Sequence, residues 1–554
     1  MIDDIPTPRK ELLFIPLGGA GEIGMNFYLY GCSGKWLAVD LGITFGDDSM
    51  PFIDVMMPDP TFIEAKKSDL AGLVITHGHE DHLGAVAHLW PRLGCPVYAT
   101  PFAAELLRGK LEEAGLLGRV PLREVPQGAK FDVGPFAIEL ITMTHSIPEP
   151  NAVVIRTPLG TVLHTGDWKF DSDPLLGPLS DTEALRRIGD EGVLAMVGDS
   201  TNAMVTGASG SEGEVRSSLI ELFSTFTGRI AVACFASNVA RLESIAVAAA
   251  ANGRRVALVG RSMKRIAEAA RRCGYLTEAP PLLSEDEVRR SPRDEVLYIC
   301  TGSQGEPRSA LARIAGEGYP GVELERGDVV IFSSRVIPGN ERAIHRLQNQ
   351  LTRLGVRVVN DRDHFIHVSG HPAREELTSM YGLVRPRIAI PIHGEMRHLA
   401  AHAALAESCG VKQALVTEDG GVVRLAPGKA ELIGMVQTGR LAMDGPRIVS
   451  LDSELLRSRK RTMFNGVVLL TLVVDRLGHL VADPQLSAPG IFDPANENDG
   501  VGVVKAVRAA VSRLSASDRR DDELMRETVR LAVRRSLKES HGKKPTTDVH
   551  LVRV

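Results

Sequence analysis

The chain has 554 residues, of which 44% are hydrophobic and 24% are charged, and its formal net charge at pH 7 is −5. This length predicts several domains with hydrophobic cores of their own, and the composition is that of an ordinary globular protein. The small negative charge excludes binding of nucleic acid through an overall positive field, so any such binding needs a local basic surface.

The sequence carries no signal for export or membrane insertion. Residues 1–6 lack a basic and apolar leader, and no apolar run approaches the length of a membrane span. The six cysteines are scattered without a CxxC pair, which argues against a disulfide framework or a thiolate zinc site. We expect a cytoplasmic protein with no membrane partner, whose cysteines are buried as small hydrophobic residues.

The first segment of the chain predicts three strands, at 11–17, 26–30 and 35–40. Between the first two lies Gly18–Gly24, which contains GxGxxG, a fingerprint of dinucleotide-binding folds that requires a helix directly behind it. Because strands follow instead, we reject nucleotide binding and expect a tight turn that approaches a metal site closely. Asp40 ends the third strand and is either an acceptor for a ligand histidine or a turn cap.

The organising stretch is THGHEDHLG at 76–84, directly behind the β-branched run at 74–76. It predicts a strand-to-helix loop that presents four candidate metal ligands: His77, His79, Asp81 and His82. His77 and His79 are two residues apart and can point to the same side, while Asp81 and His82 open the helix and can face a second ion. Four ligands cannot complete two metal shells, so further His and Asp residues must come from distant segments.

Two later strands supply such ligands. The predicted strand at 136–142 leads to His145, and the predicted strand at 161–165 leads to Asp167. Either residue alone is more often an ordinary turn residue. Because one carboxylate can bridge two cations, Asp167 is the candidate for a shared ligand.

These residues together resemble the metallo-β-lactamase superfamily. The resemblance rests on HxHxDH at 77–82, on His145 and Asp167, and on the early segments 19–26 and 40–42. The superfamily has an αββα sandwich that holds metals at one edge. Its members include lactamases, thioester hydrolases and nucleases, so the fold alone does not decide the chemistry.

The middle of the chain predicts a parallel-sheet α/β unit. Its strands are expected at 230–235, 256–259, 296–300 and 329–332, and helices at 239–251 and 262–272 alternate with them. The strands end in polar loops at 237–238, 260–262, 301–306 and 333–341. Ordinary turn chemistry explains any one of these loops, whereas four in series favour a phosphate-rich substrate.

Three further positions resemble the motifs of the β-CASP nucleases, in which a cap domain is inserted into the lactamase-like fold: Asp199, His371 and His393. With TGSQGEP at 301–307, HVSGH at 367–371 and PIHGE at 391–395, the resemblance extends to the bacterial ribonuclease J family. It covers residues 11 to about 439 and continues more weakly to the end.

This resemblance implies an α/β protein, built as a metallo-β-lactamase αββα sandwich with an inserted β-CASP α/β domain and a small α/β C-terminal domain. The predicted boundaries are 1–200 and 367–440 for the two parts of the sandwich, 201–366 for the insertion, 441–460 for a linker and 461–554 for the C-terminal domain.

Within the C-terminal domain we expect a hairpin of strands 467–473 and 479–482, helices at 500–514 and 521–540, and a strand at 548–554. The basic segment 451–461 either touches backbone phosphates or is a solvated face. The resemblance implies that this domain supports a homodimer or homotetramer.

The resemblance also assigns the site. His77, His79 and His145 would hold one divalent metal, and Asp81, His82 and His393 another, with Asp167 bridging; Zn²⁺ is favoured over Mn²⁺ or Mg²⁺. The metals would activate water for in-line attack on phosphorus. Asp81, Asp199 and His371 form the catalytic set, in which Asp199 orients His371 as general acid. A loop would cradle backbone phosphates, and its members are His367, Val368, Ser369, Gly370 and His371.

We therefore predict a ribonuclease that acts in RNA maturation and decay on single-stranded RNA threaded between the domains, together with RNA-decay partners. Its 5′-to-3′ exonuclease activity would favour a 5′ monophosphate, with some endonuclease activity. A DNA-directed β-CASP nuclease, a small-molecule hydrolase of the lactamase fold and a non-enzymatic RNA-binding scaffold remain open.

Overall fold

Residues 5, 7–46, 50, 52–316, 318–337, 339–493, 495–496 and 499–554 are described by the computed structural model. Most of residues 1–6, for which no leader was expected, and Pro338 of the loop predicted at 333–341 lie outside the described residues. The chain divides into two compact units: Met1–Phe45 with Asp54–Leu441, and Gly46–Ile53 with Ala442–Val554. No helix in the described part has the length and apolar character that crossing a membrane requires.

Two sheets of the larger unit form a sandwich. The first has eight strands, in the order β25 (Glu431–Met435), β24 (Gly421–Ala426), β1 (Leu12–Gly18), β3 (Phe27–Cys32), β4 (Lys35–Val39), β7 (Leu70–Val74), β8 (Val97–Ala99) and β9 (Leu122–Glu124). The second has seven, in the order β10 (Lys130–Val133), β11 (Phe136–Thr142), β12 (Asn151–Thr157), β13 (Gly160–His164), β14 (Ala195–Asp199), β21 (Ile388–Ile392) and β23 (Gln413–Ala414). The strands predicted from the sequence in this region are present.

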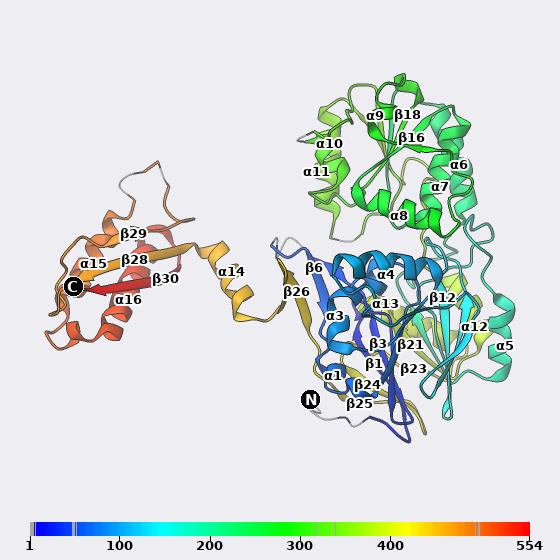
Figure 1. The fold of residues 1–554 in the computed structure, drawn as a ribbon, viewed down its shortest axis with the longest axis horizontal. Coiled ribbons are helices and arrows are strands. Elements are labelled where there is room, and N and C mark those ends of the chain that lie inside the picture. The colour runs from blue at the N-terminus through cyan, green and yellow to red at the C-terminus, as the bar shows by residue number, and fades with distance from the viewer. Residues whose placement is uncertain are drawn as a thin grey trace. The chain divides into compact units, whose positions relative to one another are not determined.

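The sheets pack face to face and helices cover their outer faces, as Figure 1 shows. Phe14 and Tyr30 of the first sheet share one buried cluster with Ile138 and Val153 of the second. Outside the first sheet lie α1 (Thr61–Glu64), α3 (Val86–Leu93) and α4 (Pro101–Glu113), and outside the second lie α5 (Thr182–Glu191), α12 (Arg374–Val384) and α13 (Met396–Ser408). Both sheets are apolar on two faces because each lies between two layers. This is the αββα sandwich that the resemblance implied.

The second sheet brings distant segments to one edge. Strands β13, β14 and β21 are neighbours and run parallel, and Asp199 at the end of β14 pairs with Ile392 at the end of β21. Carboxyl ends of parallel strands meet at the same edge, so Asp167, Asp199 and His393 lie together although the chain between β14 and β21 forms another domain.

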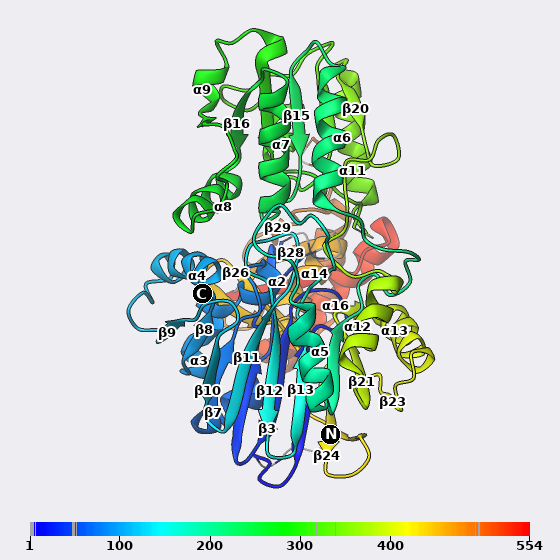
Figure 2. The ribbon, with the colours of Figure 1, turned by 90° about the vertical axis from the view of Figure 1, so that its right-hand side faces the viewer.

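That inserted domain contains a six-stranded parallel sheet with helices on both faces (Figures 1 and 2). Its strands, in order, are β17 (Leu282–Leu283), β16 (Arg255–Val259), β18 (Val296–Cys300), β15 (Ile230–Ala233), β19 (Val329–Phe332) and β20 (Arg357–Val359). Its helices are α6 (Glu212–Ser224), α7 (Val239–Ala251), α8 (Arg261–Arg272), α9 (Glu285–Val288), α10 (Ala310–Ala315) and α11 (Glu341–Arg353). The predicted parallel sheet is confirmed, while the boundaries at 201 and 366 stay a prediction.

Short elements complete the larger unit around the site: β2 (Ala20–Gly21), β5 (Thr44–Phe45), β6 (Val55–Pro58), α2 (Glu80–Leu83) and β22 (Gly394–Glu395). Strands β2 and β22 pair in parallel. They join the glycine-rich turn to the residues directly after His393.

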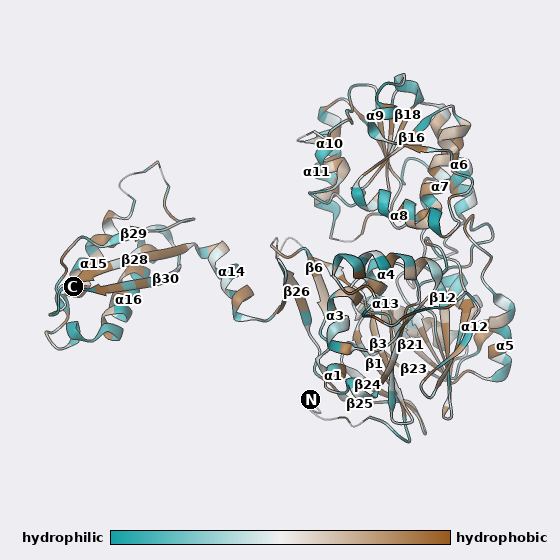
Figure 3. Cartoon of the chain, in the orientation of Figure 1, coloured by the Kyte–Doolittle hydropathy of each residue, from teal (hydrophilic) through white to brown (hydrophobic). Residues whose placement is uncertain are grey.

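The smaller unit is centred on β28 (Val467–Val474), which is drawn in hydrophobic brown in Figure 3. This strand pairs antiparallel with β29 (Gln485–Ser487) and parallel with β30 (Thr546–Arg553). Alternate residues of β28 are buried in one cluster with α15 (Val501–Arg513) and α16 (Asp522–His541). The predicted α/β character is confirmed.

One predicted strand of this unit is wrong. Residues 479–482 form no strand, and only Leu480 makes a single bridge to Val474. The carboxylate of Asp475 accepts hydrogen bonds from the backbone of Leu477 and His479, which fixes a turn instead. The antiparallel partner of β28 begins only after Pro484.

The range predicted as a linker contains regular structure. It holds most of β26 (Arg440–Asp444), β27 (Arg447–Ser450) and the start of α14 (Glu454–Asn465). Arg459 makes two hydrogen bonds to Asp444, and Arg461 pairs with Glu454. Two of the arginines considered for phosphate contact are therefore paired with carboxylates.

Candidate metal centre

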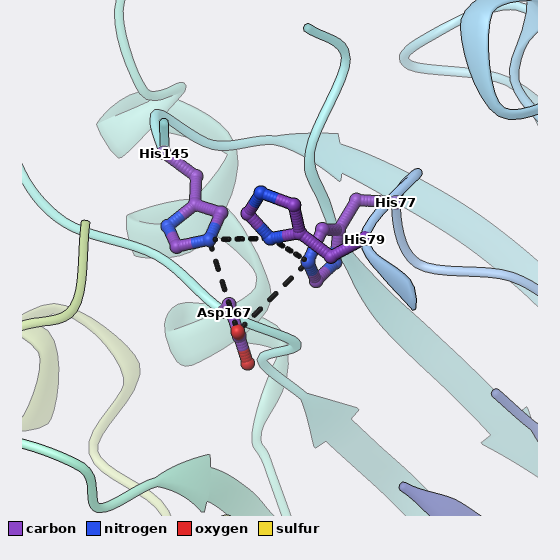
Figure 4. Close-up of side chains that lie close together, drawn as sticks. All are labelled: His77, His79, His145 and Asp167. Atoms are coloured by element: carbon purple, nitrogen blue, oxygen red, sulfur yellow. Dashed lines mark hydrogen bonds and ion pairs between the residues drawn. The ribbon is translucent and has the colours of Figure 1, made fainter. Parts of the chain in front are cut away.

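The first half of the centre consists of His77, His79, His145 and Asp167, which point toward one another in Figure 4. His77 and His79 lie in the loop between β7 and α2, and His145 and Asp167 follow β11 and β13. Nδ1 of His79 is 3.0 Å from Nε2 of His77 and 3.1 Å from Nε2 of His145. The carboxylate of Asp167 is 3.8 Å from Nε2 of both His77 and His145.

The second half consists of Asp81, His82 and His393, again with Asp167. Oδ2 of Asp167 is 3.2 Å from Nε2 of His82 and 3.5 Å from Nε2 of His393. Oδ2 of Asp81 is 3.5 Å from Nε2 of His82 and 3.8 Å from Nε2 of His393. All the ligands predicted from the sequence are thus brought together, and the same carboxylate oxygen of Asp167 faces both halves.

Four of the histidines are oriented alike. In each, Nδ1 lies within hydrogen-bond distance of an oxygen outside the ligand set, and Nε2 faces the cluster. The pairs are His77 with Thr76 Oγ1 (2.9 Å), His82 with Asp40 Oδ2 (2.7 Å), His145 with Gly370 O (2.5 Å) and His393 with Asn26 Oδ1 (2.9 Å). Such outer partners fix the tautomer and leave the other nitrogen for a metal. Of the two roles considered for Asp40, contact with a ligand histidine is confirmed.

Burial and neighbouring charges shift the pKa values of the histidines differently in the two halves of the centre. Burial lowers the pKa of His77 and His145 well below the ordinary value, and it lowers the pKa of His79 to about 4, so these rings are neutral and ready to bind a cation. Burial also opposes protonation of His82, but the carboxylates of Asp167, Asp81 and Asp40 outweigh it and raise its pKa well above 6.5. A metal at His82 therefore displaces a proton.

The donor set fits divalent metal ions. Imidazole nitrogens and carboxylate oxygens at these spacings are the ligands that zinc and neighbouring transition metals take in proteins. The carboxyl of Asp167 is buried, yet the surrounding rings of His393, His82 and His371 hold its pKa well below 3.8. An ionised, shared carboxylate among histidines is suited to neutralise part of the charge of two cations.

His371 lies beside this cluster. Its Nδ1 is 2.8 Å from the carboxylate of Asp199, as the sequence predicted, and 3.8 Å from that of Asp167. Burial opposes its protonation, but Asp199 and Asp167 together raise its pKa to about 9. At neutral pH this geometry holds a protonated imidazole next to the metal ligands.

The segment 367–371 runs directly along the first half of the centre. The carbonyl of Gly370 accepts the hydrogen bond from His145, and a Cβ at this glycine would lie 2.6 Å from the His145 ring. Ser369 Oγ accepts hydrogen bonds from Asn202 and from the His371 backbone. Val368 is buried, so its backbone rather than its side chain is available to a ligand.

The sequence did not point to Arg241, a fully buried arginine that supports this segment. Its guanidinium makes two hydrogen bonds to Glu212, two to Ser333 and one to the carbonyl of Ile366. Its Nη1 also lies 3.4 Å from Nδ1 of His367. An arginine within the largely apolar helix predicted at 239–251 was the available signal, because arginine is seldom fully buried without a partner.

Family models cover most of the chain. They are the Metallo-beta-lactamase superfamily (residues 22–223), the Ribonuclease J beta-CASP domain (227–351), the Zn-dependent metallo-hydrolase RNA specificity domain (355–416) and the Ribonuclease J C-terminal domain (454–554).

Curated relatives match over nearly the whole of this chain. Ribonuclease J of Sinorhizobium meliloti is 44% identical over 551 residues, which cover 98% of each chain. Ribonuclease J of Thermus thermophilus is 36% identical over 548 residues, which cover 97% of this chain and 94% of the relative. A solved structure, a protein of unknown function from Enterococcus faecalis, matches with a TM-score of 0.53 at 15% identity, over 75% of this chain and 100% of that one, and indicates a shared fold.

Proposed function

We propose that this chain, which belongs to the ribonuclease J family and is a metal-dependent ribonuclease, degrades single-stranded RNA mainly from the 5′ end and prefers a 5′ monophosphate. One observation carries this proposal: the segment 367–371, which offers backbone and hydroxyl groups to a phosphate, contacts the ligand His145 directly. A phosphate bound by this segment would lie close to the metals. The cut would then fall near the bound end, as exonuclease activity requires.

In this proposal His77, His79 and His145 hold one ion, Asp81, His82 and His393 hold the other, and Asp167 contacts both. The nitrogen-rich donor set suits Zn²⁺ better than Mg²⁺, which prefers oxygen ligands. When bound, the two ions would supply activation of water and stabilisation of the negative charge that develops on the phosphate oxygens.

His371 is assigned as the proton donor. The Asp199 carboxylate accepts a hydrogen bond from Nδ1 of His371 and so leaves Nε2 as the nitrogen that can reach a substrate. In hydrolysis, water adds to phosphorus, the bond from phosphorus to the 3′ oxygen breaks, and that oxygen receives a proton from His371. The shortened RNA then carries a new 5′ monophosphate, the same end group that the segment 367–371 would bind.

The preference for one 5′-terminal group of the RNA follows from the same segment, 367–371. A 5′ triphosphate is larger and more highly charged than a monophosphate, whereas a 5′ hydroxyl leaves the phosphate-binding groups without a partner. Contacts to phosphates do not distinguish one base from another, so we expect little preference for RNA sequence. We expect internal cutting where RNA reaches the metals without binding its 5′ end to the segment 367–371. Such cutting would be the endonuclease activity of the enzyme in RNA maturation and decay.

The test uses one RNA sequence whose first nucleotide is labelled and whose 5′ terminus is a monophosphate, a triphosphate or a hydroxyl. A DNA of the same sequence with a 5′ monophosphate is compared with it. We expect fastest release of labelled mononucleotide from the monophosphorylated RNA. Ser369→Ala should narrow the difference between monophosphate and hydroxyl ends, whereas Ser379→Ala on the exposed side of α12 should leave it unchanged. Equal release from all three RNA ends would contradict the preference for a monophosphate, and label only in long fragments would leave endonuclease activity as the main one. Equal cutting of the DNA would point to a nuclease without preference for RNA.

We also propose that the C-terminal domain supports a homodimer or homotetramer and that RNA-decay partners bind the assembled enzyme. The sheet of this domain exposes 42% of Leu469 and 45% of Val552, although neighbouring residues of β28 are buried. Light scattering on the full chain should give a multiple of the chain mass, and Leu469→Arg should lower it. A monomer at micromolar concentration would overturn this proposal.

A further inference from the structure

The glycine-rich turn at residues 18–24 and the residues directly after it contact His393, the candidate metal ligand that lies farthest along the chain. The carbonyl of Gly19 accepts a hydrogen bond from the backbone nitrogen of His393 at 2.6 Å, and Thr201 donates to the carbonyl of His393 at 3.1 Å. Strands β2 and β22 pair directly after Gly19 and His393. His393 has φ +53°, a left-handed conformation that a non-glycine residue adopts only when its surroundings hold it.

The side chain of Asn26 continues these contacts to the His393 ring. Its Nδ2 donates to the carbonyl oxygen of Asp81 at 3.0 Å, and because a carbonyl can only accept, the orientation of the amide is fixed. Oδ1 then accepts from the hydroxyl of Tyr28 at 2.6 Å and from Nδ1 of His393 at 2.9 Å. The hydrogen of the His393 ring is thereby placed on Nδ1. Nε2, the nitrogen left for a metal, faces the carboxylates of Asp167 and Asp81.

The glycines make room for this arrangement. A Cβ at Gly19 would lie 2.3 Å from the Tyr28 hydroxyl and 2.4 Å from Asn26 Oδ1, and a Cβ at Gly18 would lie 2.1 Å from the carbonyl oxygen of Met25. Gly19 also has φ +88°, which favours glycine. The turn therefore needs glycine where Asn26 and Tyr28 reach the metal ligand.

We propose that Asn26 is a positioning residue for the second metal: it selects the tautomer of His393 and directs Nε2 toward the shared carboxylate, while Tyr28 orients the amide. Asn26 is fully buried and has no contact with His77, His79 or His145 among the described interactions. The Nδ2 atom of Asn26 also lies 3.0 Å from Nε2 of His82. Because a bound metal would occupy that nitrogen, the positioning role of Asn26 rests on its contacts with His393 and Asp81. The effect is confined to one half of the centre.

The test measures metal affinity rather than turnover. Metal-free full-length protein is titrated with Zn²⁺ in competition with a chromogenic chelator, which gives a dissociation constant for each of two sites. Asn26→Leu should weaken one site about 10- to 100-fold, the usual effect of losing an outer partner of a ligand histidine, and leave the other unchanged. Asn26→Asp, which keeps the acceptor for His393, should restore most of that affinity.

Two matched tyrosine variants separate this role from a general packing effect. Tyr28→Phe removes the hydroxyl that orients Asn26, whereas Tyr30→Phe removes a buried hydroxyl of the same strand that contacts His164 rather than a ligand. We expect Tyr28→Phe to weaken one site and Tyr30→Phe to change neither. Should Asn26→Leu not fold, this pair decides the test. Equal weakening of both sites by Asn26→Leu or Tyr28→Phe, or two sites as tight as in the parent protein, would overturn the proposal.

Discussion

In the first half of the metal centre the three histidines come from residues 77–145, ahead of the inserted domain, whereas the second half depends on His393, which follows it. His145 and His77 are fixed by groups of the sandwich and of segment 367–371, while His393 is held in a left-handed backbone by the glycine-rich turn. The first half therefore takes its ligands from before the insertion, although His145 also contacts Gly370, which follows it. The second half forms only when the chain returns correctly from a separate domain.

The halves share Asp167, so the largest effect should come from its loss. Asp167→Asn keeps the shape but removes the charge that faces both sets of ligands, and we expect both metals to be lost and RNA cleavage to fall to background. Elemental analysis of the purified variant gives the metal content. Asp190→Asn, at an aspartate whose side chain is 70% exposed, is the control that should keep both metals. A variant at Asp167 that retains two metals would contradict the shared role.

Removing one ligand from each half tests whether the halves are separable. His79→Ala and His393→Ala should each retain one metal per chain and lose nearly all turnover, because both ions are needed at the phosphate. The measurement combines metal content with single-turnover cleavage of labelled RNA. If His79→Ala cleaves as fast as the parent protein when metal is supplied, the two-metal hypothesis fails.

His371→Ala should leave both halves intact and affect only the proton transfer. We expect kcat to fall about 10²- to 10⁴-fold, the usual range for loss of a general acid, with a smaller change in RNA affinity and unchanged metal content. Asp199→Asn should act in the same direction with a smaller effect, because it disturbs the orientation of the ring and lowers the pKa of His371 but keeps the ring in place. A defect explained wholly by weaker RNA binding would reassign His371 to phosphate binding.

The smallest effect is expected at Asp40, which touches a ligand without binding metal itself. Its carboxylate accepts from His82 and from the backbone nitrogen and hydroxyl of Thr76. Asp40→Asn should weaken the second site about 10- to 100-fold and spare the first. Equal weakening of both sites would mean that Asp40 supports the whole loop rather than His82.

The candidate metal ligands could be predicted from the sequence because each follows an apolar strand and has a side chain suited to binding a metal. His77, His79, Asp81 and His82 are also close in sequence, so their geometry follows from strand and helix periodicity. The parallel sheet of the insertion was predicted from its strong hydrophobic pattern, whereas the sandwich was implied by the resemblance of the ligand motifs to a known family.

The supporting residues could not be predicted in this way. Asn26 and Arg241 act through partners that lie far away in sequence: Asn26 reaches His393, and Arg241 reaches Glu212 and Ile366. An asparagine after a glycine turn and an arginine in a helix have many ordinary roles, and only tertiary contacts distinguish them. The strand expected at 479–482 failed because a side-chain hydrogen bond of Asp475 favoured a turn over the pairing suggested by hydrophobicity.

The central claim is that one carboxylate joins two metal sites built from different parts of the chain. Crystals of the full chain grown with Zn²⁺ and measured with X-rays above the zinc absorption edge test it directly. We predict two anomalous peaks per chain, one bound by His77, His79 and His145 and one by Asp81, His82 and His393, both within bonding distance of Asp167. A single peak, or a second peak away from Asp167, would contradict this claim.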